Sequence, residues 1–133
     1  MKTVTYSDFD AFSDSVSDVD CVMTLHNPTY RTWVLHQAQL PNIHVQLGRL
    51  GSGNIVEGSS NRDSYLLYLP LTRDCQYRAN GRDADTSKFM VLEPTSEFHL
   101  STHDPHDWCS ISFSPDSAAE YGLREAPAGD GPG

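Results

Sequence analysis

Apolar and polar residues alternate with a period of two over much of this chain, which is the pattern of half-buried β-strands. The alternation is clearest over residues 43–48, where Ile, Val and Leu are separated by His, Gln and Gly, and it recurs over 109–113. Residues 30–40 are rich in β-forming side chains, and 65–71 are almost wholly apolar, as expected of a strand covered on both faces. Residues 89–92 predict a further short strand.

Turn signals separate these apolar segments. The strongest is Asn80-Gly81, because both central residues of a tight hairpin turn take positive φ. The glycine-rich segment 51–54 predicts a hairpin bend, and Asp104-Pro105 predicts a break between the last two strands. Many short strands joined by turns indicate an antiparallel barrel or sandwich.

A helix is predicted before this β-rich region. Residues 7–19 place four apolar side chains at helical spacing, namely Phe9, Phe12, Val16 and Val19. Ser7 is the expected N-cap of this helix. We expect the apolar stripe to pack on the sheet, with a partner-binding helix as the alternative.

A second helix is predicted after the last strand, since Ser114 can cap it and Pro115 suits its first position. The predicted organisation is an N-terminal helix within 1–20, a β-domain over 21–114, a C-terminal helix over 115–124 and a flexible linker remnant over 125–133. The last segment is rich in Pro and Gly, which disfavours packing. The fold class is therefore mainly β, with one helix at each end.

The chain is acidic, with 18 Asp and Glu against 9 Lys and Arg and a formal net charge of −9 in 133 residues. Such a surface repels phosphate backbones, and no helix-turn-helix pattern occurs, so we expect no direct nucleic-acid contact. No apolar run reaches membrane-spanning length, and the N-terminus lacks the apolar block of a signal peptide. We therefore expect a cytoplasmic protein without membrane association.

The cysteine and histidine patterns do not predict a metal centre. The three cysteines form no C-x-x-C pair, and Cys109, two residues before Ile111, is expected to be a buried reduced thiol. The six histidines form no His-x-His pair, although His44 and His99 could converge across a barrel. No nucleophile motif or phosphate-binding loop occurs, so we expect no cofactor and no enzymatic activity.

The C-terminal layout of strand, loop, strand and helix over 97–116 resembles the effector domain of AraC-type transcription regulators, particularly the ethanolamine-regulator-like branch. The resemblance covers roughly 31–122. A second similar piece is 85–94, which departs from the family pattern in having Thr86-Ser87 where Pro-Gly is usual. The resemblance implies a cupin-like barrel over 21–114, a small-molecule metabolite effector bound inside it, and a homodimer paired through the C-terminal helix.

A cavity in such a barrel would be walled by aromatic rings that carry a polar handle, of which the chain has Trp33, Tyr65, Tyr68, Tyr77 and Trp108. Polar strand residues could orient the ligand. The predicted ligand-binding residues are Trp33, His44, Gln46, Tyr65, His99 and Trp108. The alternative is that the rings fill the core and leave no cavity.

Three hypotheses follow for function. The first is the effector-binding and dimerisation domain of an AraC-type regulator whose DNA-binding half is absent from this chain. The second is a stand-alone metal-dependent cupin-like enzyme that uses His44 and His99. The third is a barrel without a ligand that serves as an assembly module. The sequence does not identify the effector.

Overall fold

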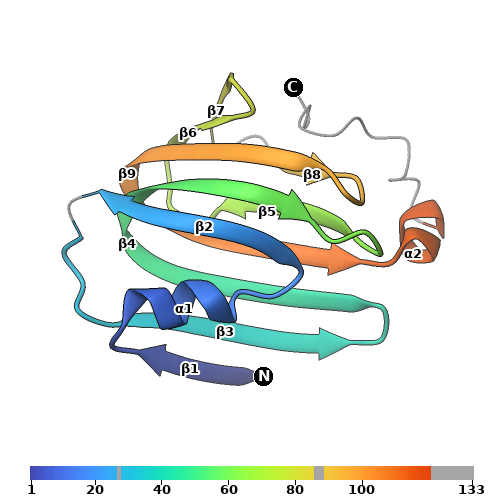
Figure 1. Ribbon diagram of the computed structural model, residues 1–133, viewed down its shortest axis with the longest axis horizontal. Helices are drawn as coiled ribbons and strands as arrows, with labels where there is room; N and C mark the ends of the chain where they lie inside the picture. Colours follow the sequence, from blue (N-terminus) through green and yellow to red (C-terminus); the bar gives the residue numbers. More distant parts are fainter. Residues whose placement is uncertain (27, 86–88, 121–133) are drawn as a thin grey trace.

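The computed structural model describes residues 1–26, 28–85 and 89–120. Figure 1 labels the helices, α1 (Phe9–Ser15) and α2 (Pro115–Glu120), and the strands, β1 (Lys2–Tyr6), β2 (Val19–His26), β3 (Trp33–Leu40), β4 (Ile43–Ser60), β5 (Tyr65–Pro70), β6 (Gln76–Ala79), β7 (Arg82–Asp85), β8 (Met90–Leu92) and β9 (Glu97–Phe113). The pairings between these strands are antiparallel. The mainly β, antiparallel fold class is thereby confirmed.

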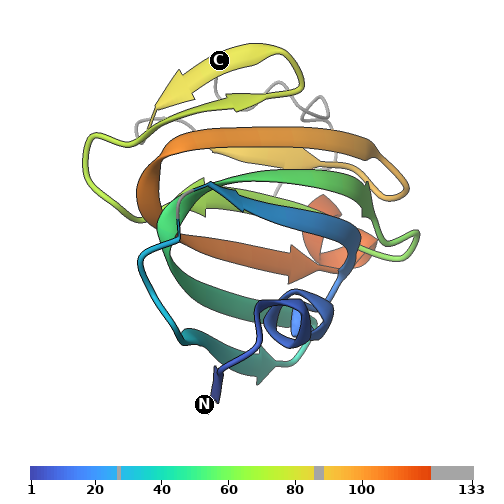
Figure 2. The same ribbon diagram turned by 60° about the vertical axis from the view of Figure 1, so that its left-hand side comes forward.

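Two long strands, β4 and β9, divide the structure into two facing sheets. Sheet I contains β1, β3, the first half of β4, the second half of β9, β5 and β8. Sheet II contains β2, the second half of β4, the first half of β9, β6 and β7. Because β4 and β9 pair along both halves, they bend together and carry the chain from one sheet to the other, as Figure 2 shows.

The sequence predicted one turn within β4 and one break within β9, and both predictions were wrong. The segment 51–54 is not a hairpin bend, and Asp104-Pro105 does not separate two strands, because both lie within continuous strands. The register between β4 and β9 shifts on either side of Ser52. A side chain at Gly53 would lie 2.2 Å from the carbonyl oxygen of His103. Glycine and proline occur both where a paired strand bends and where the chain reverses in a turn. Only the pairing with a neighbouring strand shows which of these two a segment forms.

The N-terminal helix is shorter than predicted over 7–19. Asp8, rather than Ser7, is the N-cap, and its side chain accepts a 3.2 Å hydrogen bond from the Ala11 N–H. The backbone is already extended at Val16, and β2 begins at Val19. Because β2 pairs with β4, the helix ends before the last two residues of the apolar stripe, Val16 and Val19. The strand β1, which precedes the helix, was not predicted from the sequence.

Other local predictions were correct. Asn80 and Gly81 have φ of 50° and 82° and join β6 to β7 as a hairpin. Ser114 caps α2, since its hydroxyl accepts a 3.2 Å hydrogen bond from the Ser117 N–H. The predicted end of this helix, at residue 124, and the predicted linker over 125–133 lie outside the described residues.

The main core lies between the two sheets, and α1 closes one side of it. Figure 2 shows α1 nearly end-on in the gap between β2 and β3. Phe12 of this helix is fully buried, and Phe9 packs edge-to-face on Trp33 of β3 with 5.2 Å between ring centroids. The N-terminal apolar stripe thus packs on the sheets, as expected. Within the described residues, no helix has the length and apolar character needed to cross a membrane.

Sheet I buries apolar side chains on both of its faces. The outer face carries a second cluster centred on Tyr65 and Phe113, whose rings stack with centroids 5.9 Å apart. Ile43, Leu67 and Ile111 pack against this pair. The apolar residues of the alternating pattern in β4 and β9, such as Ile43 and Ile111, therefore point away from the space between the sheets. The polar residues between them, such as Ser110, point into that space.

Candidate ligand chamber between the sheets

A small chamber of about 40 Å³ lies in the core between sheets I and II. A water molecule needs about 10–15 Å³ on this measure, so the chamber has room for water-sized molecules only. Its walls come from both sheets and from Val16, which precedes β2. The lining residues are Val16, Val19, Cys21, Met23, Asn54, Val56, Leu66, Tyr68, Met90, Phe98, Leu100, Trp108 and Ser110. The predicted cavity therefore exists in the expected place, although the surrounding rings and aliphatic groups fill most of the space.

The walls of the chamber are uncharged. Among the described residues that line it, the ionisable groups are the Cys21 thiol and the Tyr68 phenol. Burial, with a smaller contribution from the Asp20 carboxylate, raises the pKa of Cys21 to about 11. Burial also raises the pKa of Tyr68 well above its ordinary value. Both groups are therefore neutral at pH 7.

Three chamber-lining residues contain buried polar atoms that form no hydrogen bond within the described structure. These atoms are Asn54 Oδ1, the Tyr68 hydroxyl and Trp108 Nε1. Thr102 Oγ1 and His106 Nε2 extend the group toward the bend of β9. A hydrogen-bonding interaction with the Thr102 side chain opposes the rise in the Tyr68 pKa, so these two groups are near neighbours. Buried polar atoms without partners are few in native proteins, and each costs about 1–3 kcal/mol.

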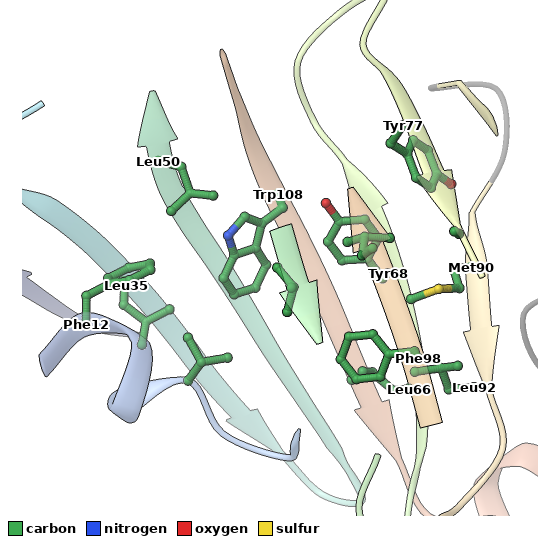
Figure 3. Close-up of a cluster of buried hydrophobic side chains, with 14 of the residues drawn as sticks. Phe12, Leu35, Leu50, Leu66, Tyr68, Tyr77, Met90, Leu92, Phe98 and Trp108 are labelled. Carbon is green, nitrogen blue, oxygen red and sulfur yellow. The ribbon is translucent and has the colours of Figure 1, made fainter. Parts of the chain in front are cut away.

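Trp108 is held in place by the strand beside it. Gly48 is its cross-strand neighbour on β4, and a Cβ at that position would lie 2.4 Å from the indole ring. The absence of a side chain at Gly48 thus lets the indole lie against the strand. On its other side, the indole centroid is 6.5 Å from that of Tyr68, and Figure 3 shows these two rings between Leu50 and Met90.

Of the predicted ligand-binding residues, Trp108 lines the chamber, whereas Trp33 and Gln46 are buried but do not line it. Trp33 packs on Phe9 of α1. Its indole N–H is also buried without a partner, although Trp33 does not line the chamber. This contrast makes Trp33 a natural control for Trp108.

Gln46 ties the segment 16–18, which connects α1 to β2, to sheet I. Its side-chain oxygen accepts hydrogen bonds of 2.7 Å from the Ser17 N–H and 3.1 Å from Gln37 Nε2. Its amide nitrogen donates a 2.8 Å bond to the Ser17 carbonyl and a 3.3 Å bond to Ser110 Oγ. These bonds occupy the amide fully, so Gln46 positions the connector that lies over the chamber.

His44 contacts the same connector through Asp18. Its Nδ1 lies 2.5 Å from Asp18 Oδ2, and both side chains are mostly buried, with 15% and 24% of their surfaces exposed. Segment 16–18 is therefore attached to sheet I at two neighbouring residues, Gln46 and His44.

Tyr65 and His99, also predicted to bind the ligand, lie outside the chamber. Tyr65 stacks on Phe113 in the outer cluster of sheet I. His99 is 54% exposed and lies 3.2 Å from Glu57 on the surface of sheet II. His44 and His99 thus do not converge. No group of three or more His, Cys, Asp or Glu side chains suited to a metal ion occurs within the described residues.

Sequence reasoning missed Asn54 as a chamber residue because the glycines around it indicated a turn. One signal could have identified it, since Asn54 precedes Val56 by two residues and must share its face if the strand continues. The predicted thiol burial at Cys109 is confirmed, and burial raises its pKa. All three cysteines are free.

No protein-family model matches the chain, and neither does any curated protein. Among solved structures, the AraC-like transcriptional activator CuxR is similar with a TM-score of 0.68 and 11% sequence identity. The match covers 96% of this chain and 53% of the CuxR chain, so this chain spans about half the length of that activator.

Two further solved structures show weaker similarity. The Cnp3 cupin domain of Schizosaccharomyces pombe has a TM-score of 0.47 and 8% identity, with coverage of 89% of this chain and 97% of that one. The plu4264 protein of Photorhabdus luminescens has a TM-score of 0.42 and 11% identity, with coverage of 82% and 86%. At these identities the comparisons concern the fold alone. The chain therefore shares its mainly β, antiparallel fold with an AraC-like activator over nearly its full length.

Proposed function

We propose that this chain is the small-molecule ligand-binding domain of an AraC-like transcription regulator of the ethanolamine-regulator-like branch, with no enzymatic activity of its own. The observation that carries the proposal is the uncharged chamber between the sheets, whose wall residues contain buried polar atoms without hydrogen-bond partners. A bound molecule would supply those partners. The fold shared with CuxR supports the regulatory context.

Ligand binding can change the shape of this domain through the connector 16–18. Val16 of the connector and Val19, the first residue of β2, line the chamber, while Ser17 and Asp18 contact Gln46 and His44 of sheet I. A ligand larger than a few water molecules must move these walls apart. Such a ligand selects the conformation in which the connector and β2 have shifted, and that difference is what a neighbouring domain would sense.

A thermal-shift screen against amines, amino acids, sugars and aromatic compounds tests the proposal. We expect at least one class to raise the melting temperature saturably, since a ligand that binds the native state at about 100 times its Kd stabilises it by about 2.7 kcal/mol. Met23→Phe, which enlarges a wall residue, should abolish the shift. Val22→Phe is the matched control because Val22 is 71% exposed on the same strand. No stabilisation by any class would favour the ligand-free assembly module instead.

Homodimer formation, a cytoplasmic location and the lack of direct nucleic-acid contact belong to the same proposal. Sedimentation velocity over a range of concentrations measures homodimer formation. Fluorescence anisotropy with labelled duplex DNA at low salt measures nucleic-acid contact, and we expect no binding because the net charge is −9. A duplex affinity in the micromolar range would contradict this part of the proposal.

A metal-dependent cupin-like enzyme remains the second candidate, favoured by the close, mostly buried pair of His44 and Asp18. Two such side chains are fewer than the three protein ligands of a typical catalytic zinc site. Elemental analysis after dialysis decides between the candidates. A stoichiometric transition metal that is lost in His44→Ala would replace the ligand-binding proposal.

A further inference from the structure

We propose that the chamber selects an uncharged ligand with an apolar body and at least one group that both accepts and donates hydrogen bonds. This inference rests on the proposed function and adds the chemical class of the molecule. It follows from two features of the chamber, its apolar walls and the lack of an ionised group among its lining residues, and from the kinds of polar atom that are buried without partners in those residues.

The apolar part of the wall determines the body of the ligand. It is formed by aliphatic, thioether and aromatic groups from the connector 16–18 and five strands, including Met23 of β2, Leu66 of β5, Met90 of β8 and Phe98 of β9. Methionine side chains have three rotatable bonds and adapt to irregular shapes. Met23 and Met90 are therefore the wall residues best able to rearrange around a ligand larger than the present 40 Å³.

The absence of ionised groups excludes a charged ligand. No Lys, Arg, His, Asp or Glu is among the described residues that line the chamber. An ion buried there would lose its hydration without gaining an opposite charge, which is strongly unfavourable. The nearby Asp20 carboxylate adds a field that opposes an anion, as its effect on the Cys21 pKa indicates. A cation would be drawn to the acidic surface but would find no counter-ion inside.

The unpartnered polar atoms determine the functional group of the ligand. Trp108 Nε1 can only donate a hydrogen bond, Asn54 Oδ1 can only accept one, and the Tyr68 hydroxyl can do either. A hydroxyl or a primary amide matches this set, because each presents an acceptor and a donor within a few ångströms. A pure hydrocarbon leaves the three atoms without partners, as they are now.

Three nearly isosteric probes test the charge selectivity: benzamide, benzoate and benzamidinium, titrated at pH 7 into the full chain. The readouts are the melting temperature and the indole N–H signals in a ¹⁵N NMR spectrum, where Trp108→Phe and Trp33→Phe assign the two tryptophans. We expect benzamide to shift the Trp108 signal saturably, and each ion to need at least tenfold higher concentration for the same shift. A preference below tenfold, with the Trp108 signal moving, overturns the inference but leaves the proposed function intact.

Two variants test whether the probe uses the chamber. Trp108→Phe should weaken benzamide binding at least threefold, because the indole donor is lost, whereas Trp33→Phe should leave it unchanged. Equal affinities of the two variants, or benzamide binding that leaves the wild-type Trp108 signal in place, would locate the site elsewhere and overturn the inference. Failure of all three probes to bind also overturns it. The proposed function is then judged separately by the metabolite screen, in which no class would bind if that function were wrong.

Discussion

At the scale of single residues, His106 shows how far burial can isolate a titratable group in this fold. It is 2% exposed at the bend of β9, opposite Ser52. Its Nδ1 donates a 3.0 Å hydrogen bond to the Asp104 carbonyl, which leaves Nε2 without a partner. Desolvation lowers the pKa of His106, while the Asp104 backbone, the Asp107 carboxylate, the Ser52 backbone and the Asp104 carboxylate partly oppose this shift.

The lowered pKa of His106 predicts a loss of stability on acidification. Below the ordinary histidine pKa of about 6.5, the unfolded chain takes up a proton that the folded chain resists. The free energy of unfolding should therefore fall as the pH decreases from 7 to 5.5. Urea unfolding at several pH values measures this dependence. His106→Gln should flatten it, and His103→Gln, an exposed neighbour in the same bend, should not. An unchanged slope in His106→Gln would contradict the assignment.

At the scale of elements, the connector 16–18 depends on one side chain of β4. Gln46 is fully buried and makes four hydrogen bonds, two of them with the backbone of Ser17. Helix α1 and strand β2 are neighbours in sequence but pack against different parts of the sandwich. Gln46 fixes the point at which the chain passes from one to the other, above the chamber.

We expect Gln46→Leu to lower the free energy of unfolding by about 1–3 kcal/mol, because it leaves the half-buried Ser17 backbone groups without partners. Hydrogen exchange at the Ser17 amide should accelerate at the same time. Gln39→Leu is the matched control, since Gln39 is exposed and bonds only to nearby carbonyls of the β3–β4 turn. Its effect should stay within about 0.5 kcal/mol. Equal effects of the two substitutions would show that the connector does not rely on Gln46.

At the scale of the whole molecule, acidic surface charge opposes the compact state. The net charge of −9 in 133 residues produces repulsion that salt screens over about 10 Å at 0.1 M. We expect the melting temperature to rise by roughly 2–5 °C between 20 and 300 mM NaCl, which corresponds to about 0.6–1.4 kcal/mol for a chain of this length. Neutralising two exposed carboxylates, in Asp20→Asn with Asp63→Asn, should raise the low-salt value and reduce the response. A melting temperature independent of salt in both proteins would contradict this prediction.

The sequence by itself determined the local elements of this protein and the acidity of its surface. The period of two, the Asn80-Gly81 hairpin and the start of α2 at Ser114 depend on nearby residues, so they could be read without a structure. The same is true of the mainly β class. These features need only local backbone preferences and the contrast between apolar and polar positions.

Only the tertiary structure decided which face of each strand is inside, where strands bend, and which residues meet at the chamber. Alternation shows that two faces differ, but sheet I buries apolar groups on both, so the pattern alone could not place Tyr65, which lies in the outer cluster. The glycines near Asn54 bend a strand because β9 pairs along the whole of β4. The chamber itself joins residues as distant as Val16 and Ser110, and such long-range packing leaves no local signal in the sequence.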